Sequence, residues 1–174
     1  MVDLTPYIQC INQVHPTMVQ KIIAIESGNN PLAININKKA GIQPKYSQPK
    51  TKKEAIQLAN YYIKKGHSVD VGYMQINSNN FKHYNVSIYD MFNPCKNISI
   101  GTTILLEAYQ QSIKKYHHPQ KALRHALSIY NTGNMYRGLN NGYVQKYTKL
   151  KINLQKAHRS NVTISTDNLY DQNK

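Results

Sequence analysis

Residues 15–31 of the chain read HPTMVQKIIAIESGNNP, and this segment predicts an amphipathic helix that ends at Gly28. Ile22 and Ile23 precede Glu26 by four and three residues, so the acid falls on the apolar face of that helix. Burial on such a face raises the pKa of a carboxyl group and keeps it protonated near neutral pH. Glu26 is therefore a candidate general acid, although many helices place a glutamate at the edge of the apolar face with its carboxyl group in solvent.

The composition is that of one domain with a hydrophobic core. The chain has 174 residues, 40% of them hydrophobic, and no stretch approaches the roughly 20 apolar residues of a membrane-spanning helix. The formal net charge is +14, from 22 basic and 8 acidic side chains, which favours contact with polyanions. The basic residues are scattered and form no long run, so we expect no specific nucleic-acid binding.

Few side chains can support acid–base or metal chemistry. The carboxylates are Asp3, Glu26, Glu54, Asp70, Asp90, Glu107, Asp167 and Asp171. The seven histidines are dispersed, and neither cysteine belongs to a CxxC pair, so the sequence predicts no metal site and no cofactor. Cys10 and Cys95 are compatible either with two buried thiols or with one disulfide.

The rest of the chain predicts helices around a short extended segment. Helices are expected at 52–65, 97–115, 119–130 and 143–156, with shorter helical pieces within 3–14, 78–84 and 87–92. HSVDVGYMQIN at 67–77 predicts a strand or hairpin, whereas 29–51 and 131–142 are expected to be loops, the first a candidate cover over a site. The fold class is therefore α+β and mostly α-helical with a small β element, in one domain over 1–157, followed by a disordered tail at 158–174.

Three short segments carry more polar residues than packing requires. They are ESG at 26–28, GYMQIN at 72–77 and ALSIYNTG at 126–133. Taken singly, the second is compatible with a plain strand and turn, and the third with a helix end capped by glycine. Their neutral hydrogen-bonding groups suit a substrate made of hydroxyls and amides, and they come from Gln75, Asn77, Tyr130 and Asn131.

In this order and at these spacings, the three segments resemble the motifs of the SLT-type lytic transglycosylases, which run ES, GLMQI and AxxYN. Longer stretches are similar to the specialised members that accompany type IV secretion and conjugation machines. These stretches are ESGNNPLAININ at 26–37, DVGYMQIN at 70–77, MFNPCKNISIG at 91–101 and YNTG at 130–133. The resemblance covers about residues 10–147 and implies a lysozyme-like domain.

The resemblance implies an enzyme that cleaves peptidoglycan glycan strands. It would break the β-1,4 bond between N-acetylmuramic acid and N-acetylglucosamine without water, leave a 1,6-anhydro sugar, and open the wall locally for an envelope-spanning secretion or conjugation complex. Glu26 would be the single catalytic acid and base, and Tyr130 would orient it. The residues expected to bind substrate are Ser27, Gln75, Asn77, Tyr130, Asn131 and, as a weaker candidate, Tyr143.

Two features leave alternatives open. Tyr73 stands where the family usually has a smaller aliphatic residue, and we expect it to narrow or rearrange a saccharide subsite. Asp70 lies two residues before Gly72; a turn-capping role is expected, but a role in positioning water would make the protein a hydrolytic muramidase. A non-catalytic basic adaptor that binds glycan or secretion components is the alternative from a different class, and a nucleic-acid-binding protein is favoured by charge alone.

The resemblance also bears on location and on the two cysteines. No export signal is present in the chain, so the protein is either cytoplasmic or a mature form, and the family implies the periplasm with the signal removed. In that oxidising compartment we predict a disulfide between Cys10 and Cys95, because the family subgroup carries cysteines at both places. Two separately buried thiols are the alternative for a cytoplasmic protein.

Overall fold

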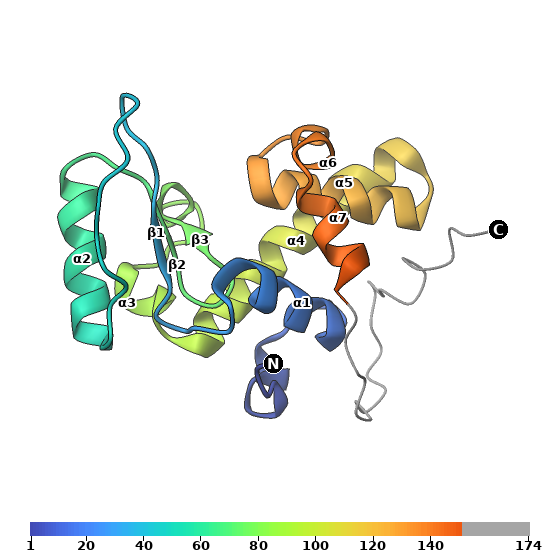
Figure 1. Cartoon of the computed structure of the whole chain (residues 1–174). Helices are drawn as coiled ribbons and strands as arrows, with labels where there is room; N and C mark the ends of the chain where they lie inside the picture. The colour runs from blue at the N-terminus through green and yellow to red at the C-terminus, as the bar shows by residue number, and fades with distance from the viewer. Residues whose placement is uncertain (151–174) are drawn as a thin grey trace.

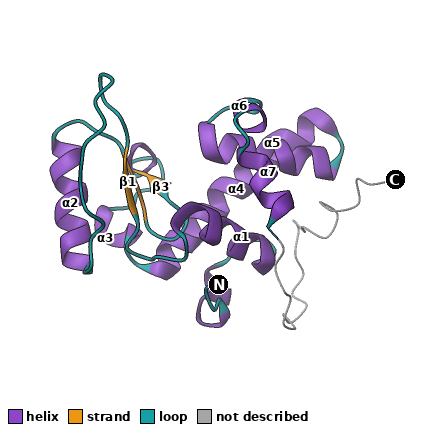
Figure 2. Ribbon diagram, in the orientation of Figure 1, coloured by secondary structure: helices purple, strands orange, loops and turns teal. Residues whose placement is uncertain are grey.

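The computed structural model is described here for residues 1–150, and this part of the chain is mainly helical (Figures 1 and 2). The helices are η1 Thr5–Cys10, α1 Pro16–Ser27, α2 Lys52–Lys64, η2 Ser78–Asn80, α3 Ile88–Met91, α4 Pro94–Tyr116, α5 Pro119–Thr132, α6 Arg137–Asn140 and α7 Tyr143–Lys149. The strands are β1 Ile34–Ile36, β2 Val69–Val71 and β3 Ile76–Asn77. The expected tail at 158–174 and the expected end of the last helix at 156 lie outside the described residues.

The three strands form one antiparallel sheet in the order β1-β2-β3. Of the strand or hairpin predicted at 67–77, the structure has the hairpin, formed by β2 and β3. The prediction that 29–51 is a loop is wrong in part, because this segment contains β1. A strand of three residues is too short to show a period of two in the sequence. β1 is an edge strand, and the loop that follows it supplies partners for its unpaired backbone groups. The Tyr46 hydroxyl accepts from the Ile36 amide at 3.1 Å, and the Gln48 side chain bonds both the N–H and the carbonyl of Ile34.

Helix α1 begins and ends where the sequence predicts. His15 caps its start by accepting from the Thr17 amide at 3.2 Å, and Pro16 occupies the first turn, where a missing N–H costs nothing. Gly28 ends the helix in the left-handed conformation with φ 59°, and its N–H donates to the Ile23 carbonyl. The four apolar side chains with no exposed surface are Met18, Val19, Ile22 and Ile23. This buried face fixes how the last turn, which holds Glu26, meets the rest of the domain.

Helix α4 runs through the middle of the fold and starts three residues earlier than predicted, because Asn93 caps it and accepts from the Lys96 amide at 3.1 Å. Asn97, almost fully buried, donates to the carbonyls of Val71 and Met91 and accepts from the Met74 amide at 2.8 Å. These bonds attach the β2–β3 turn to α4.

The β2–β3 turn approaches α4 too closely for a side chain at its first position. Gly72 has φ 78°, and a Cβ there would meet the Asn97 side chain and lie 2.7 Å from the Met91 carbonyl oxygen. Glycine in the GYMQIN segment is therefore a packing requirement, and it allows the turn that carries Gln75 to sit against the helix.

The loop expected at 131–142 contains helix α6, so that prediction is wrong in part. Ser128 of α5 donates to the Asn134 carbonyl at 2.6 Å and accepts from the Gly138 amide at 2.8 Å. A Cβ at Gly138 would lie 2.7 Å from the Ser128 Cα. The close contact between α5 and α6 therefore requires glycine at position 138. Glycine counts against a helix when a sequence is read for helical periodicity, so α6 was not predicted.

The sheet packs with α2 and α3 on one side of the domain, helices α5 to α7 lie on the other, and α4 and α1 join the two sides (Figure 1). The predicted disulfide is confirmed: Cys10 at the end of η1 is bonded to Cys95 in the first turn of α4, with a Cα–Cα distance of 5.3 Å. Among residues 1–150, none of the helices has the length and apolar character needed to traverse a bilayer.

Candidate active site

A cleft of about 880 Å³ lies between the sheet and helix α5. Its volume is in the range of small-molecule sites, roughly 300–1,000 Å³. Glu26 reaches it from the end of α1, Asp70 from the centre of the sheet, and Tyr130 from α5. Most other polar groups in its walls are neutral amides, from Asn35, Asn37, Gln75, Asn77, Asn79, Asn80 and Asn131. Such a surface binds hydroxyl and amide groups without a strong preference for charge.

Glu26 is partly exposed and has a raised pKa of about 7, against an ordinary value of 4.5. Burial is the main cause, because it disfavours the charged carboxylate. A hydrogen bond from Tyr143 lowers the pKa, the negative charge of Asp70 raises it, and the positive charge of Lys146 lowers it. At neutral pH the group is therefore close to half protonated, which suits a residue that must both give and take a proton.

Tyr143, at the start of α7, donates its hydroxyl hydrogen bond to Glu26 Oε1. The family resemblance implied this orienting role for Tyr130, but the Tyr130 hydroxyl donates to the Met74 carbonyl at 2.7 Å. Tyr130 still lines the cleft, close enough for the charge of Glu26 to raise its pKa in addition to the larger effect of burial. Tyr143, which the resemblance made a weaker candidate for binding substrate, is thus the donor to Glu26 and is not among the residues that line the cleft.

Tyr147 was missed by the sequence analysis as a site residue. It follows Tyr143 by one helical turn, has no exposed surface, and its hydroxyl lies 2.5 Å from that of Tyr143. The spacing of four residues between two tyrosines on an expected helix was the available signal, but it reads equally well as ordinary core packing.

Asp70 is held in the sheet wall by three asparagine side chains. Asn77 donates to Oδ1 at 2.6 Å, and Asn35 and Asn37 donate to Oδ2 at 3.0 and 2.9 Å. The strand register places Asn35 and Asn77 directly opposite Asp70 on either side. Among the described residues no backbone N–H donates to this carboxylate, so the expected turn-capping role is wrong. Asp70 instead organises the amides of the wall.

The remaining predicted residues fall into two groups. Gln75 lines the cleft with φ 49°, and its amide nitrogen donates to the carbonyls of Gly72 and Ala33 at 3.0 and 3.1 Å. Asn77 and Asn131 also line the cleft. Ser27 is not among the lining residues, because its hydroxyl donates to the Ile23 carbonyl of its own helix at 2.9 Å.

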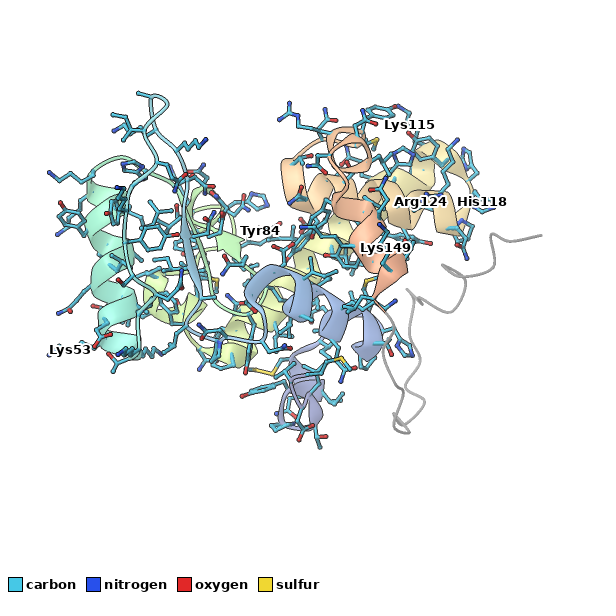
Figure 3. All side chains as sticks on the ribbon, viewed as in Figure 1. Lys53, Tyr84, Lys115, His118, Arg124 and Lys149 are labelled. Carbon is cyan, nitrogen blue, oxygen red and sulfur yellow. A yellow bond between two sulfur atoms is a disulfide. The ribbon has the colours of Figure 1, made fainter. Side chains whose placement is uncertain are left out.

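Two expectations about the shape of the cleft are not met. Tyr73 is 8% exposed and packs edge-on against Tyr7, with 6.3 Å between ring centroids, so it lies in the core and does not narrow the cleft. The segment 29–51, expected as a cover, lines the cleft with Asn35 and Asn37 in its sheet wall, and its later part bonds to β1 through Tyr46 and Gln48 and supports the edge of the sheet. Tyr84, labelled in Figure 3, does line the cleft and donates to Glu107 on α4 at 2.6 Å.

A lysozyme-like architecture results: a mainly helical domain, a small antiparallel sheet, and one protonatable glutamate at the end of a buried helix beside a polar cleft. The profile of the transglycosylase SLT domain matches residues 4–153, and the chain belongs to this family. Within residues 1–150, no group of three or more His, Cys, Asp or Glu side chains is placed to hold a metal ion.

The chain is similar to proteins named virB1. It is 35% identical over 144 residues to the type IV secretion system protein virB1 of Brucella abortus, an alignment that covers 79% of this chain and 59% of the relative. It is 35% identical over 138 residues to protein virB1 of Rhizobium radiobacter, with coverage of 79% and 56%. The chain thus spans less than two thirds of the length of these relatives. No solved structure matches it significantly.

Proposed function

We propose that the protein is a lytic transglycosylase that cleaves the glycan strands of peptidoglycan. The observation that carries the proposal is Glu26: a partly buried carboxyl group with a pKa of about 7, hydrogen-bonded by Tyr143, in the wall of an amide-lined cleft. Membership of the transglycosylase SLT domain family supports the reaction class.

In the first step Glu26, in its protonated form, gives its proton to the oxygen that links N-acetylmuramic acid to N-acetylglucosamine. The bond from that oxygen to C1 of the muramic acid breaks, and the oxygen leaves as the hydroxyl of N-acetylglucosamine. Positive charge develops at C1, where the N-acetyl carbonyl of the same sugar can stabilise it. The raised pKa of Glu26 keeps enough of the acid form available near pH 7.

In the second step the Glu26 carboxylate takes the proton from the 6-hydroxyl of the muramic acid while that oxygen bonds to C1. The product is the 1,6-anhydro sugar, Glu26 returns to its protonated state, and no water is consumed. The hydrogen bond from Tyr143 stabilises the carboxylate that exists between the two steps.

Hydrolysis is the second candidate reaction, because Asp70 lines the same cleft as Glu26. Inverting glycosidases use a second carboxylate to activate water. Asp70 already accepts three side-chain hydrogen bonds, one on Oδ1 and two on Oδ2, which leaves it less capacity to polarise a water molecule. This favours the anhydro product.

Mass spectrometry of purified peptidoglycan after digestion tests the proposal. We expect fragments that end in anhydromuramic acid, each one water lighter than a hydrolysed end. Dominant reducing ends, with Asp70→Asn inactive, would establish the muramidase instead. Binding of glycan with no cleavage at all would leave the non-catalytic adaptor.

We further propose that the enzyme works in the periplasm, with a type IV secretion or conjugation machine as its partner. The relatives from Brucella are named as type IV secretion system proteins, and the Cys10–Cys95 disulfide fits an oxidising compartment. Fractionation of the natural host and co-purification with secretion components test this assignment. Recovery of the protein in the cytoplasm with two free thiols would contradict it.

A further inference from the structure

Three buried side chains form a row that leads to Glu26. The Tyr143 hydroxyl contacts Glu26, the Tyr147 hydroxyl lies 2.5 Å from that of Tyr143, and Lys21 Nζ donates to the backbone carbonyl of Tyr147 at 3.1 Å. Their exposed fractions are 5% for Tyr143, 0% for Tyr147 and 1% for Lys21. Because water has little access to this row, its polar groups depend on one another for hydrogen bonds.

The number of hydroxyl protons fixes which residue donates in each hydrogen bond of the row. A tyrosine hydroxyl has one proton, so Tyr143 cannot donate to Glu26 and to Tyr147 at the same time. An ionised Glu26 can only accept, and Tyr143 must then donate to it. The contact between the two tyrosines is therefore a hydrogen bond only if Tyr147 donates to Tyr143. Burial raises the pKa of both tyrosines well above the usual value, so both keep their protons at the pH where Glu26 titrates.

We propose that Tyr147 and Lys21 are positioning residues for Glu26. Lys21 holds the α7 backbone at Tyr147, Tyr147 donates to Tyr143, and Tyr143 donates to the Glu26 carboxylate. For its role in catalysis this inference rests on the proposed function, in which the carboxylate must wait, correctly oriented, for the proton of the 6-hydroxyl. Lys21 and Glu26 belong to α1, and both tyrosines belong to α7, so the row also clamps the two helices together at the site.

The other titratable groups near Glu26 make no hydrogen bond to its carboxyl group. They are Asp70 on β2, Tyr130 on α5 and Lys146 on α7. Asp70 is bonded to asparagines, and Tyr130 donates to the Met74 carbonyl. Within residues 1–150, the bond from Tyr143 is therefore the one hydrogen-bonded route to the Glu26 carboxyl group.

The decisive experiment follows the Glu26 carboxyl carbon by NMR during a pH titration of the full chain, without substrate. In Tyr147→Phe we expect the midpoint to rise by roughly 0.5–1 pH unit, because Tyr143 becomes a weaker donor to the carboxylate. Tyr109→Phe is the matched control: Tyr109 is a partly buried tyrosine of α4 whose hydroxyl has no hydrogen bond among the described residues, and its midpoint should equal that of the unmodified protein.

A double-mutant cycle separates the row from general loosening of the fold. In a Tyr143→Phe background, Tyr147→Phe should cause no further shift, because the link to Glu26 is already gone. Lys21→Met should raise the midpoint in the normal background and leave it unchanged in the Tyr147→Phe background. An unchanged midpoint in Tyr147→Phe, or equal shifts with and without Tyr143, would overturn the proposal.

A measurement on the unmodified protein covers the case in which Tyr147→Phe does not fold. The hydroxyl proton resonances of Tyr143 and Tyr147 should both move with the midpoint of Glu26. A Tyr147 hydroxyl that does not respond would overturn the proposal. Since none of these titrations needs glycan cleavage, the row can be confirmed or rejected whether or not the proposed enzymatic function holds.

Discussion

The sheet wall of the cleft and the α7 side of the site present Glu26 with different chemistry. On the sheet side, Asp70 carries a negative charge surrounded by neutral asparagine amides, and it raises the pKa of Glu26. On the other side, α7 supplies a hydrogen-bond donor in Tyr143 and a positive charge in Lys146, and both lower that pKa. Burial sets the large upward shift, and the two sides adjust it in opposite directions.

This difference matches the two states that the proposed reaction requires of one carboxyl group. The acid form that begins the reaction is favoured by burial and by Asp70, whose partners are amides that do not neutralise its charge. The carboxylate that completes the reaction is favoured by the hydrogen bond from Tyr143 and by the positive charge of Lys146, both on α7. A single glutamate can therefore serve as acid and then as base because its surroundings stabilise neither form completely.

The largest loss of activity is expected on substitution of Glu26, the group on which both the sheet side and the α7 side act. Glu26→Gln should lower the rate of glycan cleavage by roughly 100- to 10,000-fold, because the amide cannot donate the proton. Release of soluble fragments from purified peptidoglycan measures the rate. Glu54→Gln, which makes the same change on α2, should cleave at the normal rate. Near-normal activity of a folded Glu26→Gln protein would remove Glu26 from its assigned role.

Glu26→Gln also tests whether burial raises the pKa of Glu26, because that shift makes the free energy of unfolding depend on pH. The pKa of Glu26 is raised in the folded protein, so the folded state holds the proton between about pH 4.5 and about pH 7 and loses stability as pH rises through that window. Above pH 7, Glu26→Gln should therefore be more stable than the unmodified protein, by roughly 1–3 kcal/mol. Urea unfolding at pH 5 and pH 8 measures the difference, which should be much smaller at pH 5.

Removal of the α7 donor should come next in size. Tyr143→Phe should lower the cleavage rate by roughly tenfold, the cost of one hydrogen bond to a charged group. It should also move the basic limb of the kcat/KM profile to higher pH, because the carboxylate loses a stabilising bond. A rate–pH series on one batch of peptidoglycan measures both changes. A basic limb that moves to lower pH would contradict the assignment of Tyr143 as the donor.

Removal of the charge on the sheet side should have the opposite sign. Asp70→Asn should retain substantial activity and move the basic limb to lower pH by roughly 0.5–1 unit, because Glu26 loses a neighbouring negative charge. Asp90→Asn is the charge-matched control, since Asp90 belongs with Ser87 to the capping box of α3 and does not line the cleft. The basic limb of this variant should stay in place. A shift in the same direction as that of Tyr143→Phe would break the contrast between the two sides.

The smallest effect is expected at Lys146. Lys146→Met should raise the Glu26 midpoint by a few tenths of a pH unit, because an exposed charge is screened by solvent. The shift should fade when the titration is repeated in roughly 1 M salt. Lys149→Met, three residues further along the same helix and also exposed, should leave the midpoint unchanged.

Local sequence was sufficient for much of the fold. The start and end of α1, the position of Glu26 on its apolar face and the β2–β3 hairpin follow from side-chain periodicity, a proline in the first turn and glycines at the ends, all of which act over a few residues. The disulfide and the cleft residues Gln75, Asn77, Tyr130 and Asn131 were indicated by family resemblance.

The tertiary structure decided what surrounds the acid. The hydroxyl that reaches Glu26 belongs to Tyr143, 117 residues further along the chain, and helix periodicity cannot tell a buried tyrosine at a site from one in the core. The setting of Asp70 depends on the register of three strands, one of them too short to be recognised from its sequence. Glu26 was identifiable because its burial follows from its own helix, whereas the balance between its acid and base forms depends on long-range packing.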